Sequence, residues 1–308
     1  MSPRITIGIP SYNGAERLDW LLKSISMRTP LLASGAVRIV IVDDGSPRVA
    51  DTRAVVARWD RELPITFIEH GVNRGISAGW NTCSMAVDAE IVVLSNDDVI
   101  MPSGGWLESF VHALQHSPGV GVVGANWHAF LAQDVEELLA GPESDLHVTP
   151  RDPSTKAHAP ERRPLFEDTN PGRVMCPTGQ LFAFRRKDFD AVGGFDERMK
   201  SFYEESSFGT EMAAKGLIGM QITWPTNWHM WSATFQVNPE LQAGQRMADS
   251  KAIYRQRWAV PDGAHEFDYT NAKYFHTIPD VAVEFLRKGG VVGRGVLCQD
   301  GKFVAAEG

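Results

Sequence analysis

Short apolar runs alternate with amphipathic stretches along the first 115 residues, and this alternation limits the folds open to the chain. Four runs have the length and composition of strands, at 5–9, 37–42, 65–68 and 90–94. Apolar residues recur at helical spacing in the stretches that follow them, at 15–27, 50–59, 76–86 and 106–115. This repeated strand–helix order predicts an α/β fold, with a mostly parallel, Rossmann-like sheet flanked by helices.

The second half of the chain has a less regular pattern. Further strands are predicted at 119–124, 181–185 and 218–224, and a further helix at 202–215. After Asn238 the chain is again predicted to be helical, through Met247 to Trp258. The stretch 127–172 is rich in proline, charge and histidine, so we interpret it as a long insertion or loop. We predict one large domain over 1–235 and a C-terminal helical extension over 236–308.

Charge and cysteine content limit the partners and the compartment. The net charge of −8 argues against nucleic acid and anionic membranes as partners, since both bind broad basic faces. The 3 cysteines lack metal-site spacing and fit a reduced compartment. The N-terminus lacks the layout of a signal peptide, and no apolar run reaches the roughly 18 residues of a membrane span. We expect a soluble, cytoplasmic protein without a transmembrane segment, and the sequence leaves its oligomeric state open.

Polar residues follow each of the first four predicted strands. In chain order they are Pro10, Ser11, Tyr12 and Asn13; Asp43 and Asp44; Asn73, Arg74 and Gly75; and Asn96, Asp97 and Asp98. Because the carboxyl ends of parallel strands share one edge of a sheet, we expect these side chains to lie together. Ligands of such sheets bind outside that edge.

Adjacent carboxylates at Asp97 and Asp98 end a predicted buried strand. Burying them is costly unless a positive charge lies nearby, and a divalent cation is the usual solution. Carboxylate-bound Mg²⁺ or Mn²⁺ normally contacts phosphate oxygens. The GxGxxG fingerprint is absent after the first predicted strand, and so is the GxxxxGK[ST] loop, which argues against a hydride-transfer enzyme and a P-loop kinase. The pair therefore indicates an enzyme of nucleotides or nucleotide sugars.

Other polar residues have an ordinary structural explanation beside a functional one. Asp43 and Asp44 could bind a base or ribose, or could simply form a turn. Glu204 and Glu205 could include a general base, or could serve the dipole at the start of a helix. His229 could be a metal ligand or a packed histidine among aromatic neighbours.

Taken together, these segments resemble a family 2 glycosyltransferase of the GT-A fold over about residues 3–235. The first half carries four matching motifs, at 7–14, 41–46, 73–77 with Asn81, and 94–98, where the family has its DxD metal motif. Downstream, 178–182, 193–197 and 202–205 resemble the acceptor-side segments of the family. Each motif alone is weak, whereas the ordered set is specific.

The resemblance implies a role for each matching residue. The donor nucleotide pocket would comprise Pro10, Tyr12, Asn13, Asp43, Asp44, Asn73, Arg74, Gly75 and Asn96. Asp97 would hold Mn²⁺ or Mg²⁺, with Asp98 beside it and His229 completing the shell. Glu205 would act as the catalytic base, with Glu204 as its neighbour. Acceptor-side residues would be Thr178, Gly179 and Gln180, joined by Trp228 and Trp231, which could equally pack in the core.

Two departures from the family pattern bear on these roles. Ser95 replaces the first aspartate of DxD, and Glu204 with Glu205 replaces the usual Glu-Asp pair. The first weakens the expected metal affinity, and the second leaves open which glutamate is the base.

The activity implied is an inverting, metal-dependent transfer of a sugar from a nucleotide-diphosphate sugar to an acceptor hydroxyl. The acceptor could be a carbohydrate, glycoside, glycolipid or protein, and the donor base and sugar stay open. A non-catalytic module that binds a nucleotide sugar or a glycan is the first alternative, favoured by Ser95. A nucleotidyltransferase is the second, although the chain lacks the basic, glycine-rich opening loop that such enzymes need.

Overall fold

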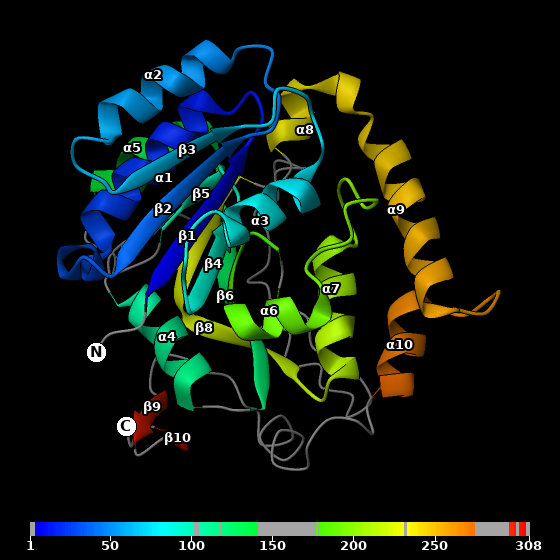
Figure 1. Ribbon diagram of the computed structural model, residues 1–308. Coiled ribbons are helices and arrows are strands. Elements are labelled where there is room, and N and C mark those ends of the chain that lie inside the picture. The colour runs from blue at the N-terminus through cyan, green and yellow to red at the C-terminus, as the bar shows by residue number, and fades with distance from the viewer. Residues whose placement is uncertain are drawn as a thin grey trace.

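A mostly parallel sheet of eight strands forms the centre of the computed structural model (Figure 1), in the order β3-β2-β1-β4-β7-β6-β8-β5. The structure describes residues 4–101, 105–116, 119–140, 177, 179–230, 233–274, 296–299 and 302–305. Most of the predicted insertion, Thr178, Trp231 and much of the C-terminal tail lie outside these ranges.

The N-terminal half has the predicted strand–helix order. Its elements are β1 (Ile5–Ser11), α1 (Ala15–Arg28), β2 (Val37–Asp43), α2 (Val49–Trp59), β3 (Ile65–Glu69), α3 (Ile76–Met85), β4 (Ile91–Ser95), β5 (Val99–Ile100) and α4 (Trp106–His116). Strand β1 pairs in parallel with both β2 and β4, and β2 pairs in parallel with β3. The carboxyl ends of these four strands therefore share one edge of the sheet, as predicted.

The remaining sheet elements are β6 (Val120–Ala129), α5 (Val135–Ala140), β7 (Leu181–Arg185), α6 (Arg186–Val192), α7 (Glu204–Ala214) and β8 (Ile218–His229). Strand β7 is antiparallel to both β4 and β6. Strands β6 and β8 both run past the ends that the sequence predicts, which lie at 124 and 224. Their pairing shifts register after Ala125↔Ile222 and resumes at Trp127↔Asn227, so Pro225 falls in an irregular stretch. The extension of β8 carries that strand to His229. The extension of β6 to Ala129 means that the first residues of the predicted insertion, 127–129, belong to a strand.

Two hydrophobic clusters cover the two faces of the sheet. Helices α1, α2 and α4 pack on one face around Leu21 and Ile7, whereas α3, α6 and α7 pack on the other around Trp80 and Phe184 (Figure 1). Gly8 permits the close approach of α3 to β1, because a Cβ atom there would lie 2.5 Å from Cys83 Cβ. The buried apolar faces fix the sheet against both helical layers, and each fully buried side chain contributes about 1.5–3 kcal/mol.

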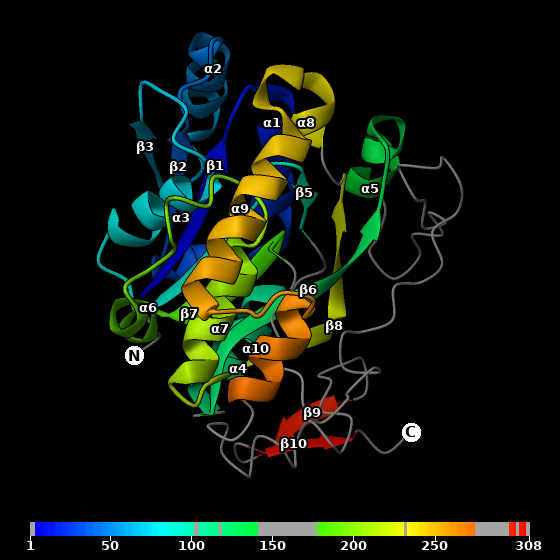
Figure 2. The ribbon, with the colours of Figure 1, turned by 90° about the vertical axis from the view of Figure 1, so that its right-hand side faces the viewer.

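Helices dominate the described part of the C-terminal region. Its elements are α8 (Ala233–Val237), a 3₁₀ turn (Pro239–Leu241), α9 (Ala243–Trp258), α10 (Glu266–Tyr274), β9 (Val296–Gln299) and β10 (Lys302–Ala305). Figure 2 shows α9 and α10 beside α7, where Tyr254 and Trp258 pack with Met199. The β9–β10 hairpin was not predicted from the sequence. Among the described helices, none has the length and apolar character needed to cross a bilayer.

Candidate active site

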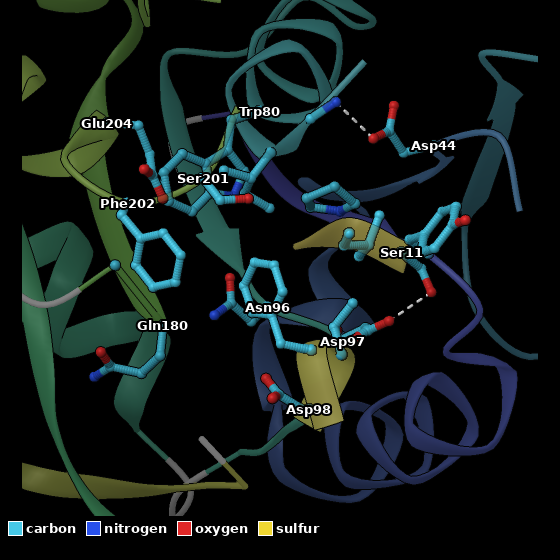
Figure 3. A pocket seen from close by; sticks show the side chains of 18 of the residues that line it. Ser11, Asp44, Trp80, Asn96, Asp97, Asp98, Gln180, Ser201, Phe202 and Glu204 are labelled. Atoms are coloured by element: carbon cyan, nitrogen blue, oxygen red, sulfur yellow. Dashed lines mark hydrogen bonds between the residues drawn. The ribbon is translucent and has the colours of Figure 1, made fainter. Parts of the chain in front are cut away.

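Residues from the strand ends, α7, β8 and the C-terminal region line one cavity of about 310 Å³. Those that the sequence singled out are Pro10, Tyr12, Asp44, Asn73, Gly75, Asn96, Asp97, Asp98, Gly179, Gln180, Glu204, Glu205 and His229. Figure 3 shows Phe202 and Glu204 on the side of the cavity opposite Asp97 and Asp98. The fold thus unites residues spread over most of the chain.

Both carboxylate oxygens of Asp97 have partners within the protein. Ser11 Oγ donates a hydrogen bond to Asp97 Oδ2 at 2.6 Å (Figure 3), and Arg17 Nε donates to Oδ1 at 3.4 Å. Burial raises the pKa of Asp97, while the Arg17 charge and the Ser11 hydroxyl oppose that shift. Arg17, in α1, also donates from Nη2 to Thr234 Oγ1 at 3.2 Å, so this ion pair is anchored to the C-terminal region.

Asp98 faces a different partner, His229. Strand β5 pairs with β8 so that Val99 lies opposite His229, and Asp98 Oδ1 lies 3.1 Å from His229 Nε2. Burial alone would raise the pKa of the Asp98 carboxyl, but the His229 imidazole lowers it below its ordinary value. Asp98 Oδ1 and both His229 ring nitrogens are buried, and apart from the contact between Asp98 and His229 none of them has a polar partner within the described residues.

The spacing of the buried Asp98–His229 pair fits a divalent cation. Two neighbouring ligands on an octahedral ion with bonds of about 2.1 Å lie about 3 Å apart. The distance of 3.1 Å between Asp98 Oδ1 and His229 Nε2 matches this spacing. Within the described residues, no three His, Cys, Asp or Glu side chains form a closed metal site. A cation here would therefore keep positions for water and phosphate oxygens, as Mg²⁺ commonly does.

Asp44 shapes the wall of the cavity at the ends of β2 and β3. Its Oδ1 accepts a hydrogen bond from Arg74 N at 2.9 Å and lies 2.7 Å from His70 Nδ1, while Oδ2 accepts from Gly75 N at 2.8 Å. Gly75 has φ +96°, and a Cβ atom there would lie 2.7 Å from backbone atoms of Lys200. Asp44 therefore holds the start of α3 in place, in addition to lining the cavity.

Three residues of the predicted nucleotide pocket, Asn13, Asp43 and Arg74, are not among those that line the cavity. Asn13 Nδ2 donates a hydrogen bond to Asn238 Oδ1 at 2.9 Å. The Arg74 side chain is exposed, and its Nη2 donates to Glu197 Oε2 at 2.9 Å. Asp43 is buried and accepts a hydrogen bond from Ser46 N at 2.8 Å, which holds the turn after β2. Their nucleotide-binding roles stay predictions, and the described contacts of all three residues are structural.

The predicted acceptor-side residues are only partly described. Gly179 and Gln180 line the cavity, and Gly179 is so close to Glu205 that an added Cβ atom would lie 3.4 Å from its Cδ. Trp228 does not line the cavity and packs instead in a hydrophobic cluster, which is the alternative that the sequence had left open. Thr178 and Trp231 lie outside the described residues.

Glu204 and Glu205 form the first turn of α7, and both line the cavity. The two residues before them, Phe202 and Tyr203, are left-handed, with φ +67° and +64°. Such backbone strain in non-glycine residues is concentrated at functional sites. Burial raises the pKa of both carboxyl groups, and that of Glu204 is raised further by the charge of Glu205. A buried carboxylate with a raised pKa is suited to accept a proton.

A segment that sequence reasoning did not assign to the site completes the cavity. We call residues 233–246 the C-terminal strap; its cavity-lining residues are Thr234, Phe235, Leu241 and Arg246. Four side-chain hydrogen bonds tie it to the N-terminal half: Arg17–Thr234, Asn13–Asn238, Tyr12–Glu240 and Asn73–Arg246. The Phe235 ring also stacks on Phe202, with centroids 5.3 Å apart. No motif marks this segment, so only the fold reveals its place at the site.

Comparison with known proteins gives consistent results for sequence and structure. The pattern described as Glycosyl transferase family 2 matches residues 6–193. An N-acetylglucosaminyl-diphospho-decaprenol L-rhamnosyltransferase of Mycobacterium tuberculosis is 25% identical over 234 residues, which cover 69% of this chain and 71% of that protein. The O-antigen biosynthesis protein RfbC of Myxococcus xanthus is 23% identical over 218 residues, but these cover only 16% of RfbC.

Solved structures with the same fold include a mannosyltransferase and TarS. One is the mannosyltransferase PcManGT from Pyrobaculum calidifontis, in complex with GDP-Man and Mn²⁺, with a TM-score of 0.59 at 21% identity. The match covers 94% of this chain and 74% of the PcManGT chain. S. aureus TarS 1–349, in complex with UDP-GlcNAc, has a TM-score of 0.52 at 14% identity. The match covers 98% of this chain and 96% of the TarS chain. At these identities the likeness concerns the fold alone, and it confirms the predicted GT-A type.

The family pattern covers more than half of the chain and ends within the region that builds the cavity. The resemblance noted in the sequence is thereby confirmed, and so is its prediction of an enzyme that transfers sugars. This protein is a glycosyltransferase and belongs to glycosyl transferase family 2.

Proposed function

We propose that the protein catalyses an inverting, metal-dependent transfer of a sugar from a nucleotide-diphosphate sugar to an acceptor hydroxyl. The observation that carries this proposal is that one cavity holds the buried Asp98–His229 pair and the two buried glutamates Glu204 and Glu205. The first pair is suited to a cation that contacts phosphates, and the second to proton removal.

The sheet order supports one direction for the donor. The nucleoside would lie over the ends of β3, β2 and β1, near Asn73, Asp44 and Tyr12. The diphosphate would follow at the end of β4, near Asp98, and the sugar would lie toward Glu205. An extended donor therefore crosses the carboxyl edge of the sheet, as ligands of open α/β sheets do.

Asp98 and His229 are the residues best placed to hold Mn²⁺ or Mg²⁺. When bound, such a cation neutralises charge that develops on the departing nucleoside diphosphate. Asp97 stays a predicted ligand, but its coordination would require Arg17 or Ser11 to release one of its oxygens. PcManGT, whose structure contains Mn²⁺ and GDP-Man, supports including manganese in the first assays.

Glu205 is our candidate for the catalytic base. It would take the proton of the acceptor hydroxyl as the oxygen attacks the anomeric carbon from the face opposite the leaving group. That geometry inverts the configuration and needs no covalent enzyme intermediate. Glu204 lies beside it at the start of α7, so the two variants must be tested separately.

The test is the release of nucleoside diphosphate from a panel of nucleotide sugars, with Mn²⁺ and with a chelator. Turnover that depends on the metal, together with its loss in Glu205→Gln at unchanged donor affinity, supports the proposal. If turnover is lost in Glu204→Gln and kept in Glu205→Gln, the base is Glu204. Metal-independent turnover refutes the cation role, and retained anomeric configuration in the product, read by NMR, refutes inversion.

Binding without any turnover supports the non-catalytic alternative, and release of pyrophosphate supports a nucleotidyltransferase.

A further inference from the structure

Arg246 is a cation inside the cavity that the proposed chemistry does not use. Among the described residues that line the cavity, it is the only lysine or arginine. It lies in the first turn of α9, and its Nη2 donates a hydrogen bond to Asn73 Oδ1 at 2.9 Å. Burial lowers the pKa of its guanidinium, while the charges of Asp44 and Glu240 oppose that shift. The side chain is thus partly desolvated and held in one direction by Asn73.

The surroundings of Arg246 place it at the nucleoside end of the cavity. Its partner Asn73 follows β3, at one edge of the sheet order, and Asp44 follows the neighbouring strand β2. The Asp98–His229 pair lies farther along that order, at the end of β4 and on β8. A donor that binds in the direction proposed above therefore brings its base, and not its diphosphate, toward Arg246.

We propose that Arg246, oriented by Asn73, selects the donor nucleobase by donating a hydrogen bond to a carbonyl oxygen on its edge. This inference rests on the proposed function and adds a base preference to it. A guanidinium has five N–H donors and no acceptor, so several donors stay available beyond the bond to Asn73.

The chemistry of the bases sets the direction of the preference. Uracil, thymine and guanine carry a carbonyl oxygen where cytosine and adenine carry an amino group. The carbonyl oxygen accepts a hydrogen bond from the Arg246 guanidinium. An amino group is itself a donor, so in its place neither it nor the guanidinium would find an acceptor. An unmade hydrogen bond in a desolvated pocket is costly, and one good arginine–base contact discriminates by roughly tenfold or more.

The test is a calorimetric titration with UDP, dTDP, GDP, CDP and ADP, each with Mn²⁺, on wild type, Arg246→Ala and Arg246→Gln. In the wild type, we expect the tightest of UDP, dTDP and GDP to bind at least about tenfold more tightly than CDP and ADP. Arg246→Ala should reduce that ratio to about one, mainly by weakening the preferred nucleotide. Arg246→Gln should strengthen CDP or ADP, because an amide can also accept.

Gln245→Ala is the matched control, since Gln245 is the exposed neighbour on α9 and does not line the cavity. It should keep the wild-type ratio, and unchanged melting temperatures will show that all three variants are folded. A uniform loss of affinity for all five nucleotides in Arg246→Ala would overturn base selection and make Arg246 a phosphate ligand. A lower melting temperature with an unchanged ratio would make it purely structural. If no nucleotide binds to the wild type, the proposed function fails instead.

Discussion

At the scale of single residues, the two adjacent aspartates after β4 have different electrostatic environments. Asp97 is paired with Arg17 and Ser11, whereas Asp98 faces His229 and keeps an oxygen without a hydrogen bond. The carboxylate that the family motif points to is thus neutralised within the protein. Its neighbour, one residue later, is our candidate ligand for an external cation.

This difference predicts opposite profiles for the two alanine variants. Asp97→Ala should lower the free energy of unfolding by about 3–5 kcal/mol, because it leaves the buried Arg17 charge unpaired. Asp98→Ala should lower the free energy of unfolding much less than Asp97→Ala does. It should nevertheless abolish the metal-dependent release of nucleoside diphosphate. Urea denaturation and the release assay measure the two effects. Equal destabilisation by both variants would contradict the assignment.

The pKa of Glu205 leads to a pH prediction. Burial raises that pKa above the ordinary value of 4.5, and a base works only when it is ionised. The rate should therefore fall, as the pH decreases, through a pKa above 4.5, and not at the pKa of an exposed glutamate. The acidic limb of kcat/KM against pH reports this value. A limb at or below 4.5 would show that the base is another group.

At the scale of elements, the C-terminal helices are joined by an ion cluster. Glu266 begins α10 and is buried, and its Oε1 accepts from Arg255 Nη1 of α9 at 2.6 Å and lies 3.2 Å from Lys251 Nζ. Burial alone would raise the pKa of Glu266, but hydrogen bonds from Arg255, from its own backbone N–H and from Lys251 lower it to about 2. The contact therefore links α9, which carries Arg246, to the helix that packs beside it.

Glu266→Gln tests this link. The variant should unfold about 1.5–3 kcal/mol more easily at neutral pH, since it removes a charged hydrogen bond. The folded pKa lies below the unfolded one, so the stabilisation is present above about pH 4.5 and is lost as the pH falls toward 2. Chemical denaturation at several pH values should show the two proteins converging in that window. A gap that persists at pH 2 would indicate a packing effect.

The sequence predicted some elements better than others, for physical reasons. Strands β1 to β4 alternate with helices of strong apolar periodicity, so local pattern was sufficient to place them and their shared edge. The predicted strand at 218–224 stops short of Pro225, whereas the long parallel pairing of β8 with β6 continues past an irregular stretch. The extension of β8 to His229 depends on tertiary pairing, which no local pattern reveals.

At the scale of the whole molecule, the cavity is built by parts of the chain that are far apart in sequence. Tyr12 and Glu240 are 228 residues apart, and Asn73 and Arg246 are 173 apart, yet each pair is hydrogen bonded. Residues at strand ends were predictable because topology alone brings them together. The strap residues were not, since their contacts come from how α8 and α9 pack and carry no motif.

A ligand that spans these parts should stabilise all of them together. A nucleoside diphosphate with Mn²⁺ should raise the melting temperature, and at 100 times its Kd it adds about 2.7 kcal/mol to the free energy of unfolding. Removing the metal with a chelator should reverse most of the shift, because the phosphates lose their cation. Differential scanning fluorimetry measures both steps. A shift that is insensitive to the chelator would contradict a metal-bridged diphosphate.

The dependence of the cavity on the C-terminal strap has a consequence during synthesis. A nascent chain can pair β1, β2, β3 and β4 soon after they leave the ribosome, but Thr234 and Arg246 emerge long after. The cavity therefore lacks these lining residues until translation has passed Arg246 in α9. If the cavity binds the proposed donor, a chain that has been translated only as far as residue 232 lacks the strap side of that site.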